Sequence, residues 1–239
     1  GICHQILPEN GYVRPCSVVV ATDSHTTTHG ALGSYAFGIG ATERASVWTL
    51  GCALNVDVPR TIKVVVNGKF PEYVLPKDMI LYLIGQLTAE GANFKVIEFH
   101  GETIRNMSTS GRLVLCNMAA EMGAKNGYVA PDETTRAWLA GRTDQPYEEV
   151  HPDPDASYER VLHYDVSDLP PQVAKPHRVD NVVPVTEVAG LQINQALIGT
   201  CTNGRLEDIR VAAEILRGKK IADGFQLSVI PASRDIYLQ

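Results

Sequence analysis

Apolar and polar positions in the first sixty residues follow the order strand, polar loop, helix. The apolar, β-branched run CSVVVAT at residues 16–22 predicts a buried strand. A polar, glycine-rich segment comes next, and residues 42–54 then have a helical pattern. Because ligands bind at the carboxyl ends of strands in α/β sheets, the polar segment is a candidate binding loop.

A second unit begins near residue 61, where Asn67-Gly68 lies between two extended runs and predicts a hairpin. Pro76 and Gly91 mark the ends of a predicted helix. The remaining expected elements of this unit are a strand at 95–101 and helices at 110–127 and 132–141.

Residues 142–185 contain seven of the chain's 14 prolines, which indicates a long surface connection or a passage between domains. After it come a strand at 192–199, a helix at 205–218 and a strand at 225–233. This βαβ pattern predicts a parallel sheet, and the chain as a whole is predicted to be an α/β protein with sheets flanked by helices.

Composition narrows the possible functions. The 239 residues are 44% hydrophobic, enough for a sizeable core, and the net charge is −6. Without a basic block, neither nucleic acid nor an anionic membrane surface is expected as a partner. No apolar run approaches the ~20 residues of a spanning helix. The first residues lack the basic and apolar regions of a signal peptide, so we expect a cytoplasmic protein.

The five cysteines, at positions 3, 16, 52, 116 and 201, are odd in number and widely spaced. This does not suit a disulfide framework and indicates a reducing compartment. We expect Cys16, Cys52 and Cys116 in the core, whereas the sequence does not assign Cys3 to the core or to a site.

Cys201 lies in LIGTCTNGRLED, between a predicted strand and a predicted helix. Backbone N–H groups and a helix dipole at that position favour a thiolate, which suits a nucleophile or a metal ligand. Asn203 would place an amide beside the sulfur and orient a cluster or substrate. The alternative to a functional thiolate is a buried structural thiol at the end of the strand.

Asp23-Ser24-His25 could orient a substrate carboxylate, hold a water or bond a hydroxyl, with Asp23 fixing the tautomer of a nearby histidine. Metal binding by His25 and His29 needs a helix, which the threonine run and Gly30 disfavour. A hydrolase triad is disfavoured because adjacent loop residues do not easily form the relay. Turn and capping chemistry is the structural alternative.

Two further residues carry candidate chemistry. His4, in the apolar run GICHQI, is either a satisfied core histidine or part of a site. Glu98, between Ile and Phe, is expensive to bury unless it is paired, so it lies either on an exposed strand face or in a polar site.

Six segments follow one another along the chain: GICHQI, DSHTTTHGALGSYAFGIGATE, VIEFHG, LCNMAAEMGA, GTCTNGRLEDIRVAAEIL and VIPASR. Together they resemble the aconitase family over essentially the whole chain, most closely the large subunits of 3-isopropylmalate dehydratase and homoaconitase. The resemblance implies three α/β domains around a [4Fe–4S] cluster, of which this chain would carry parts at 1–59, 60–185 and 186–239. It also implies a fourth domain or a separate small subunit that closes the site.

The family moves water across a carbon–carbon double bond of a hydroxy-di- or tricarboxylic acid. By resemblance, Cys201 is the first of three cluster ligands, and the open fourth iron acts as a Lewis acid. His25 matches a histidine that bonds the substrate hydroxyl or a cluster-bound water, and Asp23 matches its orienting carboxylate.

The resemblance implies roles for three more residues. His4 matches another active-site histidine, Glu98 matches a carboxylate close to the open iron, and Ser24 matches a contact to a substrate carboxylate. Isopropylmalate, homocitrate or homoaconitate, and dimethylmalate are not distinguished as substrates.

The chain also departs from the family pattern. No Cys-x-x-Cys pair follows IPASR, so one of three cluster ligands is present. The upstream Asp-His pair, the substrate arginines and the serine base of the small subunit are missing, and Arg178-Val179-Asp180-Asn181 replaces Ser-Pro-Asp-Asn. We therefore expect an internal piece of a large subunit that works in a heterodimer and is inactive alone.

Two alternatives remain open. One is a non-catalytic binding module that keeps the fold without the cluster, as in RNA-binding relatives, although the net charge of −6 counts against RNA. The other is a mononuclear-metal hydrolase built on Asp23, His25 and His29.

Overall fold

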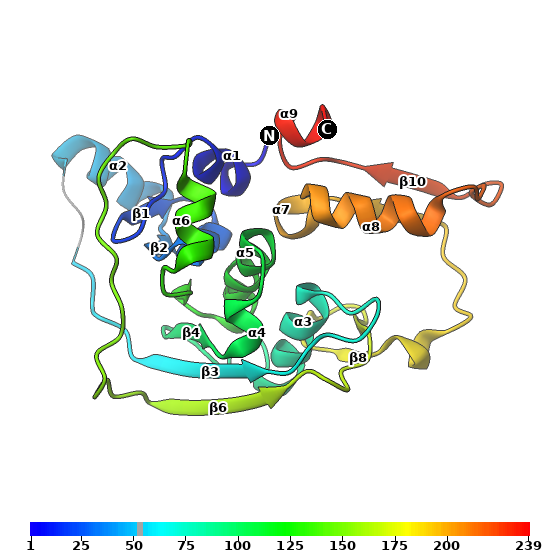
Figure 1. Cartoon of the computed structure of the whole chain (residues 1–239), viewed down its shortest axis with the longest axis horizontal. Helices are drawn as coiled ribbons and strands as arrows, with labels where there is room; N and C mark the ends of the chain where they lie inside the picture. The colour runs from blue at the N-terminus through cyan, green and yellow to red at the C-terminus, as the bar shows by residue number, and fades with distance from the viewer. Residues whose placement is uncertain (52–54) are drawn as a thin grey trace.

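The computed structural model describes residues 1–51 and 55–239 (Figure 1). The strands of these residues form a central four-stranded sheet and three two-stranded sheets. The central sheet has the order β5-β4-β3-β6, and all neighbours in it run parallel. Its strands are β3 Thr61–Asn67, β4 Val96–His100, β5 Asn126–Tyr128 and β6 Arg160–Asp165.

The main core lies between this sheet and its helices. Ile62, Val64 and Val66 of β3 are fully buried while the residues between them are half-buried, as the period of a strand dictates. Apolar side chains of two helices, α3 and α5, join them in one cluster. The helices of this unit are α3 Pro76–Leu87, α4 Glu102–Arg105, α5 Thr109–Met118, the 3₁₀ turn η2 Ala119–Met122 and α6 Glu133–Leu139.

The first unit is richer in structure than its sequence pattern predicted. Its elements are α1 Cys3–Glu9, β1 Val18–Ala21, the 3₁₀ helix η1 Ser24–Leu32, β2 Tyr35–Gly38 and α2 Ala41–Leu50. The expected strand is β1, but it is half exposed instead of buried. The expected polar loop contains η1 and β2, which pairs with β1 in parallel. Residues 26–32 of η1 are buried and pack against α5 and β5.

The structure corrects the expected hairpin and the expected burial of one cysteine. Asn67 and Gly68 form no hairpin: β3 has parallel neighbours, and Asn67 Oδ1 instead accepts a hydrogen bond from the Glu102 N–H at 3.0 Å. Cys16 is exposed and not in the core, whereas Cys116 is fully buried as expected. Cys52 and the end of the predicted helix at 42–54 lie outside the described residues.

The proline-rich segment 142–185 is more than a connection. Its first part, 142–159, is irregular, but β6 then forms an edge of the central sheet. The antiparallel pair β7 Gln172–Ala174 and β8 Val182–Pro184 follows.

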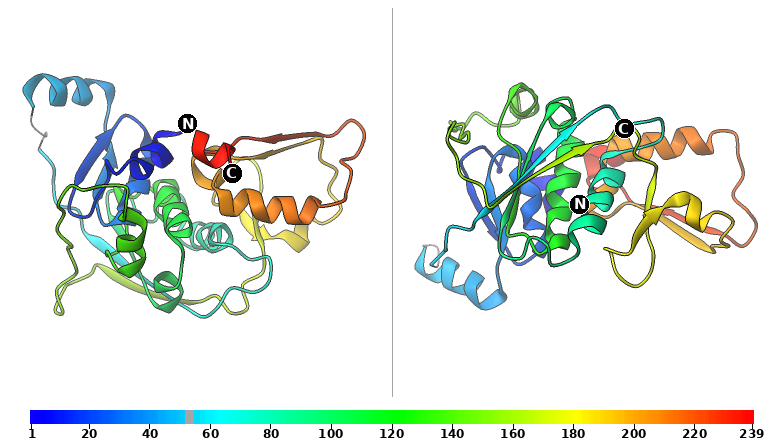
Figure 2. Two further views of the ribbon diagram at one scale, coloured as in Figure 1. Left: turned by 45° about the horizontal axis from the view of Figure 1, so that its top comes forward. Right: turned by 90° about the horizontal axis from the view of Figure 1, so that it is seen from below.

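The last unit confirms the predicted βαβ order, because β9 and β10 run parallel with α8 between them. Its elements are η3 Val185–Val188, β9 Gln195–Ile198, α7 Thr200–Asn203, α8 Leu206–Leu216, β10 Gln226–Val229 and α9 Arg234–Tyr237. This unit projects from one side of the molecule and α2 from the other (Figure 2). The Ile2 N–H donates to the Ala232 carbonyl at 2.8 Å, which holds the start of α1 beside α9. None of the described helices has the length and apolarity needed to span a membrane.

Candidate functional site

Asp23 links the two histidines that the sequence singled out. Its Oδ1 lies 2.9 Å from His4 Nε2 on α1 and accepts a hydrogen bond from the His25 N–H at 2.8 Å. The second bond caps the N-terminus of η1, so the capping role and the site role belong to the same carboxylate.

The electrostatics of this pair follow from burial. His4 is 1% exposed, and burial lowers its pKa although the bond to Asp23 opposes that shift. Burial raises the pKa of Asp23, but hydrogen bonds from His4 and from the His25 N–H outweigh it and hold that pKa below its usual value. His4 is therefore neutral near pH 7 and Asp23 is ionised.

A second histidine–carboxylate pair joins His25 to Glu121 of η2. His25 Nε2 lies 2.9 Å from Glu121 Oε1, and His25 Nδ1 lies 3.2 Å from Ser24 Oγ. This hydrogen bond raises the pKa of His25 and lowers the pKa of Glu121. The sequence analysis missed Glu121, whose signal was a carboxylate closing the apolar helical stretch LVLCNMAAEM.

Glu98 is not part of this cluster. It is 8% exposed on β4, and its Oε1 lies 2.8 Å from His100 Nε2. No hydrogen bond among the described residues connects it to His25 or Cys201. The carboxylate that contacts the His25 ring at hydrogen-bond distance is thus Glu121, and Asp23 is the one that contacts the His4 ring.

Cys201 lies at the turn between β9 and α8, as its sequence position indicated. Gly199 takes a φ of +159°, and a Cβ there would meet the Ile230 carbonyl at 2.7 Å, so the strand ends on a close backbone approach. The thiol is free and half-buried. The helix that begins there is the four-residue α7, and the long helix α8 starts only at Leu206.

Asn117 of α5 connects the turn of Cys201 to the loop of His25. Its side chain is fully buried; Nδ2 donates to Thr28 Oγ1 at 2.8 Å, and Oδ1 accepts from Thr202 Oγ1 at 2.9 Å. The Cys201 sulfur lies 3.9 Å from the same Oδ1. The amide beside the thiol is therefore that of Asn117, which the sequence analysis did not identify.

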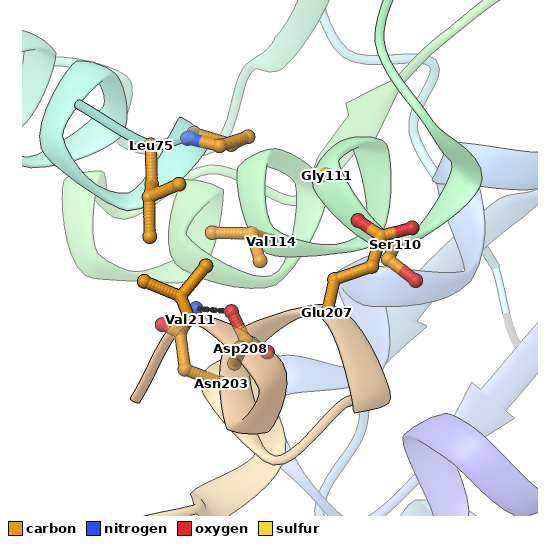
Figure 3. Close-up of a pocket in the computed structure, with 9 residues that line it drawn as sticks. Leu75, Ser110, Gly111, Val114, Asn203, Glu207, Asp208 and Val211 are labelled. Carbon is orange, nitrogen blue, oxygen red and sulfur yellow. Dashed lines mark hydrogen bonds between the residues drawn. The ribbon is translucent and has the colours of Figure 1, made fainter. Parts of the chain in front are cut away.

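Asn203 has a different environment from the one expected. Its Nδ2 donates to Asp208 Oδ1 at 2.7 Å, and it lines a pocket of about 60 Å³ between α3, α5 and α8 (Figure 3). That volume is too small for a di- or tricarboxylate. A pocket of about 720 Å³ over β1, β2 and α2 is lined by none of the candidate residues. The side chains of Asp23 and His25, by contrast, lie at a partly open surface.

His29 does not join His25. A 3₁₀ helix has three residues per turn, so positions i and i+4 do not share a face. His29 is 1% exposed, its ring centroid lies 5.5 Å from that of His4, and burial lowers its pKa to about 3. In residues 1–51 and 55–239, no three His, Cys, Asp or Glu side chains are grouped to hold a metal ion, which counts against the mononuclear-metal alternative.

Two cations lie close to the thiol turn, and neither carried a sequence signal. Burial lowers the pKa of Lys77, although negative charge at Cys201, Asp208 and Glu121 opposes the shift. Arg205 is 2% exposed, and burial lowers its pKa to about 10, so it stays charged at neutral pH.

Comparison with known proteins places these residues in a family context. The family model described as "Aconitase family (aconitate hydratase)" matches residues 1–239. The chain is 54% identical to "3-isopropylmalate dehydratase large subunit 1" of Methanopyrus kandleri, over 99% of the chain and 56% of that protein. It is 50% identical to "Probable methanogen homoaconitase large subunit" of Methanosarcina mazei, over 100% of the chain and 60% of that protein.

A solved structure agrees with the fold. Aconitase X of Thermococcus kodakaraensis, in its holo-form, superposes with a TM-score of 0.54 at 17% identity, covering 100% of this chain and 56% of that one. The chain therefore spans a little over half the length of the relatives it matches. The match of the family model over every residue shows that the chain belongs to the aconitase family.

Proposed function

We propose that this chain is part of the large subunit of a hydro-lyase of the 3-isopropylmalate dehydratase type, with parts of three α/β domains at 1–59, 60–185 and 186–239. The observation that carries the proposal is one hydrogen-bonded network that contains His4–Asp23, His25–Glu121 and the turn of the free thiol Cys201. Relatives at 54% and 53% identity bear the dehydratase name. Homoaconitase is the alternative, supported by a relative at 50%.

We infer that Cys201 supplies one of three cysteine ligands of a [4Fe–4S] cluster and that the other two lie outside this chain. A free, half-buried thiol on a tight turn fits such a ligand. When bound, the cluster supplies a Lewis acid for the hydroxyl and carboxylate of the substrate.

His25 is the group best placed to move a proton. Glu121 occupies its Nε2 and favours the protonated ring, so Nδ1, beside Ser24 Oγ, carries the transferable proton. It would donate to the departing hydroxyl and recover the proton on rehydration. Asp23 fixes the backbone of His25, and the exposed Ser24 hydroxyl would bind a substrate carboxylate.

The open character of the site supports a closing partner. The side chain of His25 is 25% exposed and that of Asp23 is 53% exposed. Neither the pocket of about 60 Å³ nor the pocket of about 720 Å³ is lined by Asp23 or His25. A small subunit that covers this surface would exclude water and supply the base that removes the carbon-bound proton.

The test uses the full natural reading frame that encodes the chain, expressed without oxygen together with its small subunit. Cys201→Ser should lose iron, the brown absorbance and turnover of 2-isopropylmalate, whereas the matched Cys16→Ser, at an exposed thiol, should keep all three. His25→Ala should keep its iron and lose about 10²- to 10⁴-fold in turnover. Normal iron in Cys201→Ser would refute the cluster assignment and favour a cluster-free binding role. Preference for homocitrate or homoaconitate would favour the homoaconitase alternative.

A further inference from the structure

Among the described residues two arginines are buried, Arg112 and Arg205, and they differ in how their charges are balanced. Arg112 of α5 is 0% exposed and forms a forked pair with Asp132, at 2.7 Å and 2.6 Å. Its remaining bond goes to the Arg105 carbonyl at 3.0 Å. The charge of Arg112 is thus met by a carboxylate inside the chain.

Arg205 has no such partner among the described residues. Its guanidinium donates to the carbonyls of Thr202 and of Cys201, the latter at 3.3 Å, and its Nε, like that of Arg112, is buried without a hydrogen-bond partner. None of the salt bridges of the described residues includes it. Both acceptors belong to the four-residue turn that carries the Cys201 thiol.

The nearby carboxylates are engaged elsewhere. Asp208 accepts hydrogen bonds from the Arg205 backbone N–H at 3.1 Å and from Asn203 Nδ2 at 2.7 Å. Glu207 accepts from Ser108 Oγ at 2.8 Å. These carboxylates and the Cys201 sulfur act on the guanidinium only at longer range.

The buried charge of Arg205 therefore calls for a negative partner that is not among the described side chains. A guanidinium stays protonated in proteins, and burying it without a counter-charge is costly. The group towards which Arg205 is directed is the thiol turn, and a thiolate-held iron–sulfur cluster is an anion. Arg205 therefore has the position and the charge to balance that anion from beneath the turn.

We propose that Arg205 is a positioning residue for the cluster: it fixes the turn of Cys201 through two carbonyls and supplies the buried positive charge that balances the metal-bound thiolate. The inference rests on the proposed function and deepens it. Arg205 would then have two separable effects. Its forked donors would hold the geometry of the Cys201 ligand, and its positive charge would raise the reduction potential of the cluster.

The experiment measures, in the full-length large subunit with its cluster, the rate of iron loss to a chelator and the reduction potential. Arg205→Gln removes the charge and should accelerate iron loss about 10- to 100-fold and lower the potential. Arg205→Lys keeps the charge without the fork, so the potential should stay near that of the wild type while iron loss accelerates. Arg210→Gln, at an exposed arginine of α8, should change neither because its charge is screened by solvent.

The possible outcomes are distinguishable. If the wild type binds no cluster, the proposed function fails and this inference fails with it. If the wild type holds its cluster and Arg205→Gln matches Arg210→Gln in both readouts, the inference alone is overturned. If Arg205→Gln does not fold, Arg205→Lys decides: wild-type iron retention contradicts the proposal, and faster loss at an unchanged potential supports it.

Discussion

His25 Nε2 lies 2.9 Å from Glu121 Oε1, although 96 positions of sequence separate the two residues. The contact joins η1 to η2, two 3₁₀ segments from different units of the fold. The other ring nitrogen, Nδ1, has no carboxylate within hydrogen-bond distance, because Asp23 Oδ1 lies 3.7 Å from it. The contact with Glu121 therefore sets the charge of the ring and turns Nδ1 towards Ser24 Oγ.

We predict that Glu121→Gln lowers the pKa of His25 towards its ordinary value, because the largest favourable contact is removed while partial burial remains. NMR titration of the His25 ring measures this directly. Glu90→Gln, at an exposed carboxylate, is the control and should leave the titration unchanged. An unaltered His25 titration in Glu121→Gln would mean that the contact does not control its charge.

The same pair predicts a window of stability. The contribution of His25, whose folded pKa is raised, is fully present below 6.5 and is lost as the pH rises through the raised value. The contribution of Glu121, whose folded pKa is lowered, is present above 4.5 and is lost as the pH falls through the lowered value. The stability difference between wild type and Glu121→Gln should therefore be largest between these limits, as urea denaturation at several pH values would show.

His29 should make the fold sensitive to acid. Its folded pKa of about 3 lies below the ordinary 6.5, so its contribution is present above pH 6.5 and declines as the pH falls towards 3. The slope from one such group is about 1.4 kcal/mol per pH unit. His29→Phe should remove that part of the slope below pH 6.5, whatever its effect at pH 7. His151→Phe, at an exposed histidine, should keep it; equal slopes in both variants would contradict the assignment.

Replacing Asn117 should lower the free energy of unfolding substantially. Asn117→Ala removes the bonds to Thr28 and Thr202. It leaves the Thr202 hydroxyl without its acceptor, at about 1–3 kcal/mol, whereas the Thr28 hydroxyl still donates to the His25 carbonyl. We expect a loss of about 2–4 kcal/mol in the free energy of unfolding, measured with urea. Asn10→Ala removes a single exposed bond to the Ile6 carbonyl and should cost under about 1 kcal/mol. A cost for Asn117→Ala no greater than for Asn10→Ala would show that this network does not hold the two loops together.

The local patterns predicted elements well where one face of an element is buried against one core. The extended run predicted from near residue 61 is β3, and the helix predicted to begin at Pro76 is α3. The sequence pattern could not show which strands pair with one another. Asn67-Gly68 marks the end of a strand equally in a hairpin and in a parallel sheet, and β6 was hidden in a proline-rich segment because an edge strand needs less apolar character.

The candidate site shows the same limit. Asp23 and His25 were identified in the polar, glycine-rich segment and His4 in the apolar run GICHQI, and the structure brings them together. Glu121 and Asn117 reach them from another unit, so only the fold reveals the contact. Glu98 and Asn203 carry suitable chemistry in the sequence, but their side chains pair with neighbours outside this cluster, His100 and Asp208.

The forked pair of Arg112 and Asp132 gives a test of buried charge that is independent of the site. Asp132 also caps α6 by accepting from the Thr135 N–H at 3.2 Å. Because asparagine caps helices as well as aspartate does, Asp132→Asn changes the charge balance while keeping the cap. Removing one partner of a buried pair costs about 3–5 kcal/mol, and since the Asp132 side chain is 33% exposed we expect about 2–3 kcal/mol. Urea denaturation should show a lower midpoint at an unchanged m-value. Asp144→Asn, at an exposed carboxylate, should leave the midpoint unchanged, and a similar result for Asp132→Asn would mean that solvent compensates Arg112.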